Sequence, residues 1–246
     1  MDLGLSGRTA IVCGASSGIG LGIAESLAGE RANVVMFARR PELLEQEAGR
    51  IGGVPVAGDV TSRDDLERLV TTTVDAYGGI DILVNNSGGP PRSTAAELDA
   101  EKVEAAVALL LVSVVRLTGL CLPYLERSSA GRIVNVTSST VREPIDNLAL
   151  SNAIRPGVVG WAKSLARELG PKGITVNCLA PGRIDTERIR EVYPDGPSED
   201  DLAAIPLRRL GTTREIGDVV AFLCSERASY VSGTVMLVDG ALTRGL

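Results

Sequence analysis

The sequence predicts a single-domain, doubly wound α/β fold, in which a seven-stranded parallel sheet carries helices on both faces. Runs rich in valine and isoleucine alternate with amphipathic segments, a pattern typical of parallel sheets that are covered on both sides. A chain of 246 residues is long enough to bury one large core. Because no linker, repeat or low-complexity tract divides the sequence, we expect one domain over residues 1–246.

Seven apolar runs are the predicted strands. They are TAIVCG, NVVMFA, VPVAGD, DILVNN, RIVNVTS, ITVNCLA and TVMLVD. Amphipathic patterns place helices near residues 18–29, 41–51, 62–77, 99–126, 148–169 and 214–226. The region of about 181–210 is irregular and rich in proline, glycine and acidic residues, so we expect a mobile loop with short helices. A long loop at the carboxyl end of a strand is a usual place for a substrate lid.

Composition excludes several kinds of partner and site. A net charge of −6 without any basic stretch argues against nucleic acid binding. The absence of histidine removes the commonest general base and zinc ligand, and we expect no metal site. The four cysteines lie far apart inside apolar runs, so buried free thiols in a reducing cytosol are favoured over disulfides or metal ligands; they are Cys13, Cys121, Cys178 and Cys224.

Neither the first residues nor the most apolar run indicates a membrane protein. The first residues lack the long apolar core and cleavage site of a signal peptide, so we expect a cytoplasmic protein. The most apolar run, AAVALLLVSVVRLTGLCLPYL, is interrupted by Arg116. It is interpreted as a buried interface helix. Together with the 151–169 helix, which is also apolar on two sides, it predicts a homotetramer or a homodimer.

A glycine-rich turn, GASSGIG, lies between the first predicted strand and the first predicted helix. Gly14 permits a tight turn, Gly18 lets the backbone approach a pyrophosphate, and Gly20 lets the helix pack close to the sheet. The helix N-terminus adds N–H donors and a partial positive charge. In this position the three glycines predict a dinucleotide-binding site.

Four further segments share this context: GDVTSRDDLERLV, NNSGG, RIVNVTSS and GITVNCLAPGRIDTE. With the glycine turn they resemble the short-chain dehydrogenase/reductase family over nearly the whole chain. The last part, IPLRRLGTTREIGDVVAFLCSERASYVSGTVMLVDGA, resembles bacterial 3-oxoacyl-acyl carrier protein reductases. The resemblance implies a Rossmann-type fold and a nicotinamide cofactor. It also implies the cofactor contacts, which are Gly14, Ser16, Ser17, Gly18, Ile19, Gly20, Arg39, Asp59, Val60, Asn86, Ser87, Gly88, Arg155, Pro181, Gly182, Ile184 and Thr186.

The end of the second strand bears on cofactor choice. Relatives that prefer NAD carry an acidic residue there, which bonds the ribose diol. Here Ala38 leaves room, and Arg39 follows it where relatives pair an arginine with the 2′-phosphate. We therefore expect NADP(H) to be preferred, with NAD(H) possible. The alternative, that RRPE is simply a solvated helix start, remains open.

The family resemblance also implies a catalytic set that this chain lacks in part. The family uses a serine, a tyrosine thirteen residues later, a lysine four beyond it, and an asparagine in the preceding long helix. Ser138 matches the serine, but the other positions hold Leu110, Ser151 and Arg155. A serine hydroxyl is a much weaker acid than a phenol, and an arginine with a pKa above about 12 does not shuttle protons. Ser138, Ser151 and Arg155 remain the catalytic candidates, and tyrosine-type reduction is not expected.

The surroundings of this set suggest other candidates. Pro156 is expected to kink the helix or displace its start near 152–156, which would free the carbonyl of Asn152. Ser139, Arg142 and Tyr193 are candidate substrate contacts. Tyr193 is either a proton donor on the lid or a surface tyrosine. Arg142 and Arg155 together could bind an anionic substrate such as a carboxylate.

Three functions stay open. The first is an NADP(H)-binding oxidoreductase that acts on a small carbonyl or alcohol substrate with a non-standard proton donor. The second is a non-redox enzyme on the same scaffold, such as a dehydratase or isomerase. The third is a cofactor-binding pseudoenzyme or partner subunit. The cofactor-facing motifs favour the first, and the missing tyrosine, lysine and asparagine oppose it.

Overall fold

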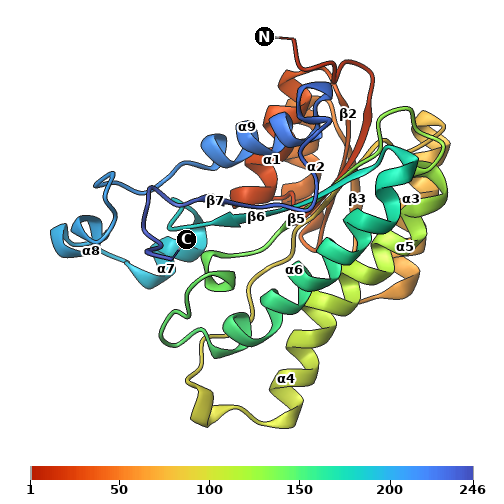
Figure 1. Cartoon of the computed structure of the whole chain (residues 1–246). Coiled ribbons are helices and arrows are strands. Elements are labelled where there is room, and N and C mark those ends of the chain that lie inside the picture. The colour runs from red at the N-terminus through yellow and green to blue at the C-terminus, as the bar shows by residue number, and fades with distance from the viewer. Residues whose placement is uncertain (1, 246) are drawn as a thin grey trace.

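Seven parallel strands form one sheet in a computed structural model that describes residues 2–245 (Figure 1). Their order is β3-β2-β1-β4-β5-β6-β7. Their bounds are β1 (Thr9–Cys13), β2 (Asn33–Ala38), β3 (Val54–Ala57), β4 (Ile82–Asn85), β5 (Arg132–Val136), β6 (Thr175–Pro181) and β7 (Val235–Val238). The strand order reverses between β1 and β4, and such a switch opens a crevice at the carboxyl ends of the strands. The predicted fold class is confirmed.

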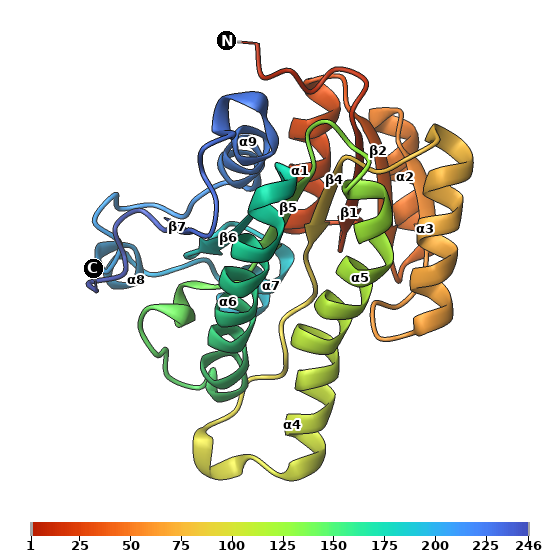
Figure 2. The ribbon, with the colours of Figure 1, turned by 45° about the vertical axis from the view of Figure 1, so that its right-hand side comes forward.

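Helices cover both faces of this sheet (Figure 2). They are α1 (Gly18–Gly29), α2 (Pro41–Ile51), α3 (Arg63–Tyr77), α4 (Ala100–Val107), α5 (Ser113–Leu125), α6 (Ala149–Leu169), α7 (Glu187–Val192), α8 (Glu199–Ala203) and α9 (Thr213–Cys224). Buried residues of α1, α2 and α9 form one core with Ala10 and Val12 of β1, while those of α3, α5 and α6 form a second core with Ile11 and Cys13. The strands are apolar throughout because each alternates its side chains between these two cores.

The most apolar segment is a helical rod from Ala100 to Leu125 that joins α4 and α5 through a π-helical turn at Ala108–Val112. Its length and composition would suffice to cross a membrane, a test that core helices of globular proteins also pass. Leu117 and Leu125 pack fully buried in the core beneath α5. The π-helical turn was not predicted.

Helices α1 and α9 touch through glycines. A Cβ added to Gly22 would lie 2.5 Å from the backbone oxygen of Thr213, and one added to Gly217 would lie 2.8 Å from the carbonyl carbon of Gly22. The hydroxyl of Ser26 donates to Asp218 across the same contact, at 2.9 Å. The helix that follows the glycine turn is therefore held in place by the C-terminal part of the chain.

Helix α6 contradicts one expectation. It runs unbroken from Ala149 to Leu169 with Pro156 inside it, so the displaced start near 152–156 is wrong. The residues around the proline explain this, since Leu150, Ile154 and Val158 are buried and hold the first turns against the protein. Asn152 also anchors the preceding loop, because its side-chain amide donates to the backbone oxygen of Ile145 at 2.9 Å.

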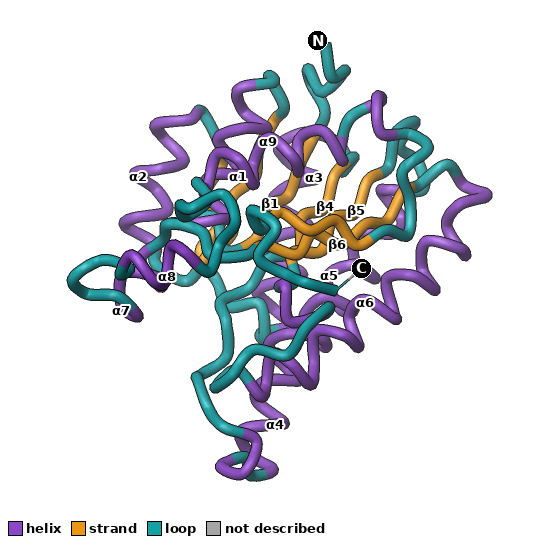
Figure 3. Tube along the Cα trace, turned by 60° about the vertical axis from the view of Figure 1, so that its left-hand side comes forward, coloured by secondary structure: helices purple, strands orange, loops and turns teal. Residues whose placement is uncertain are grey.

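The region predicted to be a lid contains the short helices α7 and α8, which lie among loops apart from the main helical layers (Figure 3). Short helices in this region were expected. The chain end returns to the neighbouring loop, where the backbone N–H of Arg244 donates to Glu143 at 3.1 Å. The loop after β5 is thus held from two sides, by Asn152 and by the C-terminal segment.

Candidate active site

The glycine turn has the geometry that its sequence predicts. Gly14 and Gly18 have φ values of +62° and +56°, in the left-handed region that favours glycine. A Cβ on Gly20 would lie 2.5 Å from the carbonyl carbon of Gly14, so no larger residue fits where α1 meets the turn. Ser16 is buried, and Ser17 is the N-cap of α1. The first N–H groups of α1 therefore face the crevice, where they can bind a phosphate.

The ends of β3 and β4 bring a second group of expected cofactor residues together. Val60, Asn86 and Ser87 line one small pocket, and Gly88 follows in the exposed part of the loop. The Asn86 amide donates to the carbonyl of Cys13 at 3.1 Å, which ties the end of β4 to the end of β1. Asp59 accepts the N–H and the hydroxyl of Thr61 at 2.8 and 2.7 Å, and these bonds hold its pKa below the usual range.

Two arginines flank the glycine turn at the end of β2. Ala38 ends the strand, and Arg39 is exposed directly after it, with its charge close enough to Asp59 to help lower the pKa of that carboxyl. Arg40 donates to the hydroxyl of Ser17 at 2.6 Å and lies 3.4 Å from the Glu187 carboxylate of α7. The sequence analysis placed Arg40 at a helix start and did not count it as a site residue.

The turn after β6 leads into a segment that contacts the glycine turn. Pro181 ends β6, and a Cβ on Gly182 would lie 2.5 Å from the Asp239 side chain. Ile184 is buried in the core beside α1. Thr186 is the N-cap of α7 and lies over the glycine turn, since a Cβ on Gly18 would be 3.4 Å from its methyl carbon. The base of the lid region thus contacts the turn at α1.

Ser138 and Ser151 are joined by a residue that was not predicted. Ser138 is partly exposed at the end of β5, and its hydroxyl accepts the backbone N–H of Thr140 at 3.2 Å. The hydroxyls of Thr140 and Ser151 lie 3.0 Å apart, both buried, in one hydrogen bond. Ser139 is buried in the same short turn. Ser151 therefore shares one hydrogen bond with Thr140, in which either hydroxyl can be the donor.

Arg155 is a buried cation. Its side chain is 8% exposed, and Nη1 donates to the backbone oxygen of Val136 at 3.1 Å. Burial, with a smaller contribution from the nearby charge of Arg188, lowers the pKa of Arg155 to about 10. The expectation of a value above about 12 is wrong, because that value belongs to a solvated guanidinium.

Arg188 on α7 is the second cation here, and the sequence analysis missed it. Its Nη2 donates to the backbone oxygen of Pro90 at 2.8 Å. Arg142 is exposed on the loop after β5. Among residues 2–245, Arg188 rather than Arg142 is the cation whose charge acts on Arg155.

Leu110 occupies an apolar cluster instead of a polar relay. It lies in the π-helical turn, is 2% exposed, and packs with Ala106, Leu150 and Ile154. The first turns of α6 contribute Leu150 and Ile154, so the clustered side chains come from both sides of the site.

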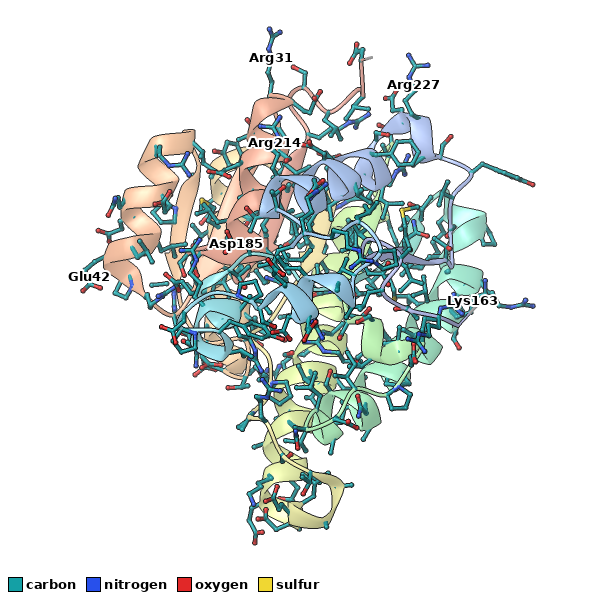
Figure 4. The ribbon with its side chains drawn as sticks, turned by 90° about the vertical axis from the view of Figure 1, so that its left-hand side faces the viewer. Arg31, Glu42, Lys163, Asp185, Arg214 and Arg227 are labelled. Carbon is teal, nitrogen blue, oxygen red and sulfur yellow. The ribbon has the colours of Figure 1, made fainter. Side chains whose placement is uncertain are left out.

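Tyr193 and Lys163 make their hydrogen bonds outside this set of residues. Tyr193 ends α7, and its phenol donates to Asp201 at 3.2 Å inside the lid region. Lys163 of α6 points outward at the edge of the molecule and donates to the backbone oxygen of Gly233 at 2.8 Å, so it does not replace the missing lysine (Figure 4).

The four cysteines are buried and free, as expected. No cluster of three or more potential metal ligands occurs in the part of the chain that the structure describes.

Comparisons with known proteins agree with this geometry. The family model described as enoyl-(acyl carrier protein) reductase matches residues 14–243. The 3-oxoacyl-acyl carrier protein reductase of Vibrio cholerae is 36% identical over 244 residues, which cover 98% of this chain and 99% of that protein. The chain belongs to the short-chain dehydrogenase/reductase family.

Two solved structures of short-chain dehydrogenases/reductases are similar over their whole length. L-sorbose reductase from Gluconobacter frateurii, solved with NADPH and L-sorbose, is 31% identical with a TM-score of 0.94 and full coverage of both chains. An NADPH-bound short-chain oxidoreductase from Pseudomonas aeruginosa, described as containing an atypical catalytic center, is 30% identical with a TM-score of 0.93 and 99% coverage of both.

Three residues that lie close to the expected site residues were not predicted from the sequence: Arg40, Thr140 and Arg188. Arg40 was visible beside Arg39, and Thr140 lies two residues after Ser138. The position of Arg188 had no sequence signal, because it depends on how α7 folds back over the loop after β4.

Proposed function

We propose that this protein is an NADP(H)-dependent oxidoreductase that reduces a carbonyl group of a small molecule, or oxidises the corresponding alcohol, without a catalytic tyrosine. The proposal is carried by two observations, the buried guanidinium of Arg155 at the end of β5 and the positive φ values of Gly14 and Gly18 in the glycine turn. The described residues fit the cofactor, because Gly14 and Gly18 have positive φ values and a Cβ on Gly14 or Gly20 would collide with neighbouring atoms, so the turn forms a cradle without side chains. Arg39 and Arg40 are placed to bind a 2′-phosphate.

The same residues suggest how a reduction proceeds. Bound NADPH supplies a hydride to the carbonyl carbon. Ser138 presents a partly exposed hydroxyl that can donate to the carbonyl oxygen. Arg155 stays protonated at neutral pH, since its pKa is about 10, and stabilises negative charge that develops on that oxygen. Because Ser151 is bonded to Thr140 and the Leu110 cluster is apolar, the oxygen takes its proton from water.

Cofactor binding is the first test. NADPH and NADH are titrated against the purified protein by calorimetry and ligand fluorescence. We expect micromolar or tighter binding of NADPH, worth about 8 kcal/mol, and weaker binding of NADH. Net NADPH oxidation with a stoichiometric alcohol product supports the proposal. Loss of substrate without net cofactor change supports a dehydratase or isomerase instead, and binding without turnover over a broad carbonyl panel supports a pseudoenzyme.

We also propose a homotetramer or homodimer in which the rod Ala100–Leu125 forms an interface. Its valines Val103, Val112 and Val115 are 37%, 37% and 40% exposed in the single chain, which is unusual for an apolar helix without a partner. Light scattering should give a mass of two or four chains, and Val112→Glu with Val115→Glu should lower it. Four free, buried cysteines support a cytoplasmic location.

A further inference from the structure

Two arginines from different parts of the fold lie close enough for the charge of one to lower the pKa of the other. Arg155 comes from α6 and Arg188 from α7. Each guanidinium donates one hydrogen bond to a backbone oxygen, that of Val136 for Arg155 and that of Pro90 for Arg188. A guanidinium carries five N–H donors, so both have further donors to offer. Arg188 is exposed, and a ligand can reach it from solvent.

Neither arginine of this pair belongs to an ion pair among the residues that the structure describes. Within residues 2–245, no carboxylate lies within 4.0 Å of either guanidinium, whereas other arginines of the lid region are paired. Arg183 lies 3.7 Å from Asp201, and Arg190 lies 3.1 Å from Asp185. A buried cation next to a second cation is costly unless an anion joins them. The lowered pKa of Arg155 is the expected response to that arrangement.

The absence of a side chain at Gly89, in the loop after β4, makes room for Arg188. A Cβ on Gly89 would lie 2.5 Å from the guanidinium carbon of Arg188, so the guanidinium rests directly against the Gly89 backbone. Thr186, two residues before Arg188, caps α7 over the glycine turn. The Arg188 guanidinium is thus held against the loop after β4, through Gly89 and Pro90. An exposed arginine without such contacts would extend into solvent.

We infer that the substrate carries a carboxylate that Arg188 binds, next to the carbonyl group that is reduced. This inference rests on the proposed function and names the substrate class, oxo acids. A carboxylate matches the planar fork of a guanidinium and restores the charge balance around Arg155. The pyrophosphate of the cofactor is the other anion that could occupy this position, and the experiment separates the two.

The experiment compares acids with their neutral esters. The probes are 2-oxobutyrate, acetoacetate and 4-oxopentanoate, each with its methyl ester, and the readout is NADPH oxidation. Each pair has the same ketone and differs in charge. We expect at least one acid to exceed its ester about tenfold in kcat/KM. Arg188→Gln should lower kcat/KM for that acid about tenfold, mainly through KM, and leave the ester within about twofold.

Arg190→Gln is the matched control, because it removes the same charge from the same helix at a residue that is paired with Asp185. It should behave as wild type. Esters that equal their acids in the wild type, or an equal loss for acid and ester in Arg188→Gln, would overturn the inference. NADPH binding weakened about tenfold in Arg188→Gln would also overturn it and assign Arg188 to the pyrophosphate.

Calorimetry keeps the inference separate from the proposed function. The NADPH complex is titrated with the same acids whether or not they are reduced. Saturable binding that Arg188→Gln abolishes supports the anion site, even when no turnover occurs and the proposed reduction fails. If none of the acids binds to the complex, the inference is wrong.

Discussion

The cofactor side and the substrate side of this crevice are built in different ways. On the cofactor side, backbone geometry sets the shape: Gly14 and Gly18 have positive φ values, and close contacts exclude a side chain at Gly14 and Gly20. On the substrate side, the shape depends on pairs of side chains from distant segments, such as Thr140 with Ser151 and Leu110 with Ile154. A backbone cradle admits few substitutions. A set of side chains can be exchanged while the strands and helices that hold it remain unchanged.

The largest effect is expected from breaking the cradle. Gly20→Val places a side chain 2.5 Å from the Gly14 carbonyl carbon, and the turn must move. NADPH affinity should fall at least about 100-fold, or about 3 kcal/mol, by calorimetry. Gly29→Ala is the control, since it lies at the other end of α1 with nothing within 4 Å. If Gly20→Val binds NADPH normally, the cradle does not hold the cofactor.

The next effect is expected from replacing Arg155 on the substrate side. Arg155→Met should lower kcat about 100-fold, because it removes the charge opposite the developing oxyanion. It should also stabilise the cofactor-free protein at pH 7 by up to about 3 kcal/mol, since a cation whose pKa is lowered by burial opposes folding while it is charged.

The pH dependence of folding stability tests whether the charge of Arg155 opposes folding. The folded-state pKa of Arg155, about 10, lies below its ordinary value, so the destabilising effect of the buried charge is complete below pH 10 and fades as pH rises above it. The stability gap between Arg155→Met and wild type should therefore narrow at pH 10.5 compared with pH 7 in denaturant titrations. Arg167→Met, at an exposed position on the same helix, should show no such gap.

A smaller effect is expected at the end of β2. Arg39→Glu should weaken NADPH binding about tenfold and leave NADH unaffected, because the new carboxylate repels a 2′-phosphate that NADH lacks. Arg63→Gln is a suitable control, since Arg63 is exposed and pairs only with Glu67 on α3. Equal losses of affinity for NADPH and NADH would show that Arg39 does not bind the 2′-phosphate.

The smallest effect is expected where the two sides meet. Glu187 of α7 lies 3.4 Å from Arg40 and competes with a 2′-phosphate for it. Glu187→Gln should strengthen NADPH binding about two- to threefold, in keeping with an exposed ion pair. Fluorescence titration at low and high salt measures this. Unchanged affinity at low salt would show that Arg40 is not shared between the lid region and the cofactor.

The sequence was sufficient to predict the sheet, the main helices and the cradle, because each depends on local spacing or on alternation toward two cores. The residues Ser138, Ser151 and Arg155 could be located by counting from motifs. Their partners could not, since Thr140 and Arg188 meet them only through the turn after β5 and the fold of α7. The displaced start of α6 was a wrong prediction for the same reason: tertiary packing of Leu150, Ile154 and Val158 outweighs the local cost of Pro156.

The contact between Gly22 and Gly217 has a consequence for biogenesis. During synthesis, α1 leaves the ribosome long before α9, and until then nothing occupies the surface that Gly22 presents to Thr213. The nascent chain therefore cannot complete the support of the glycine turn until residues 213–224 have emerged. Any chain released early would carry every glycine of the turn and still lack the helix that braces it.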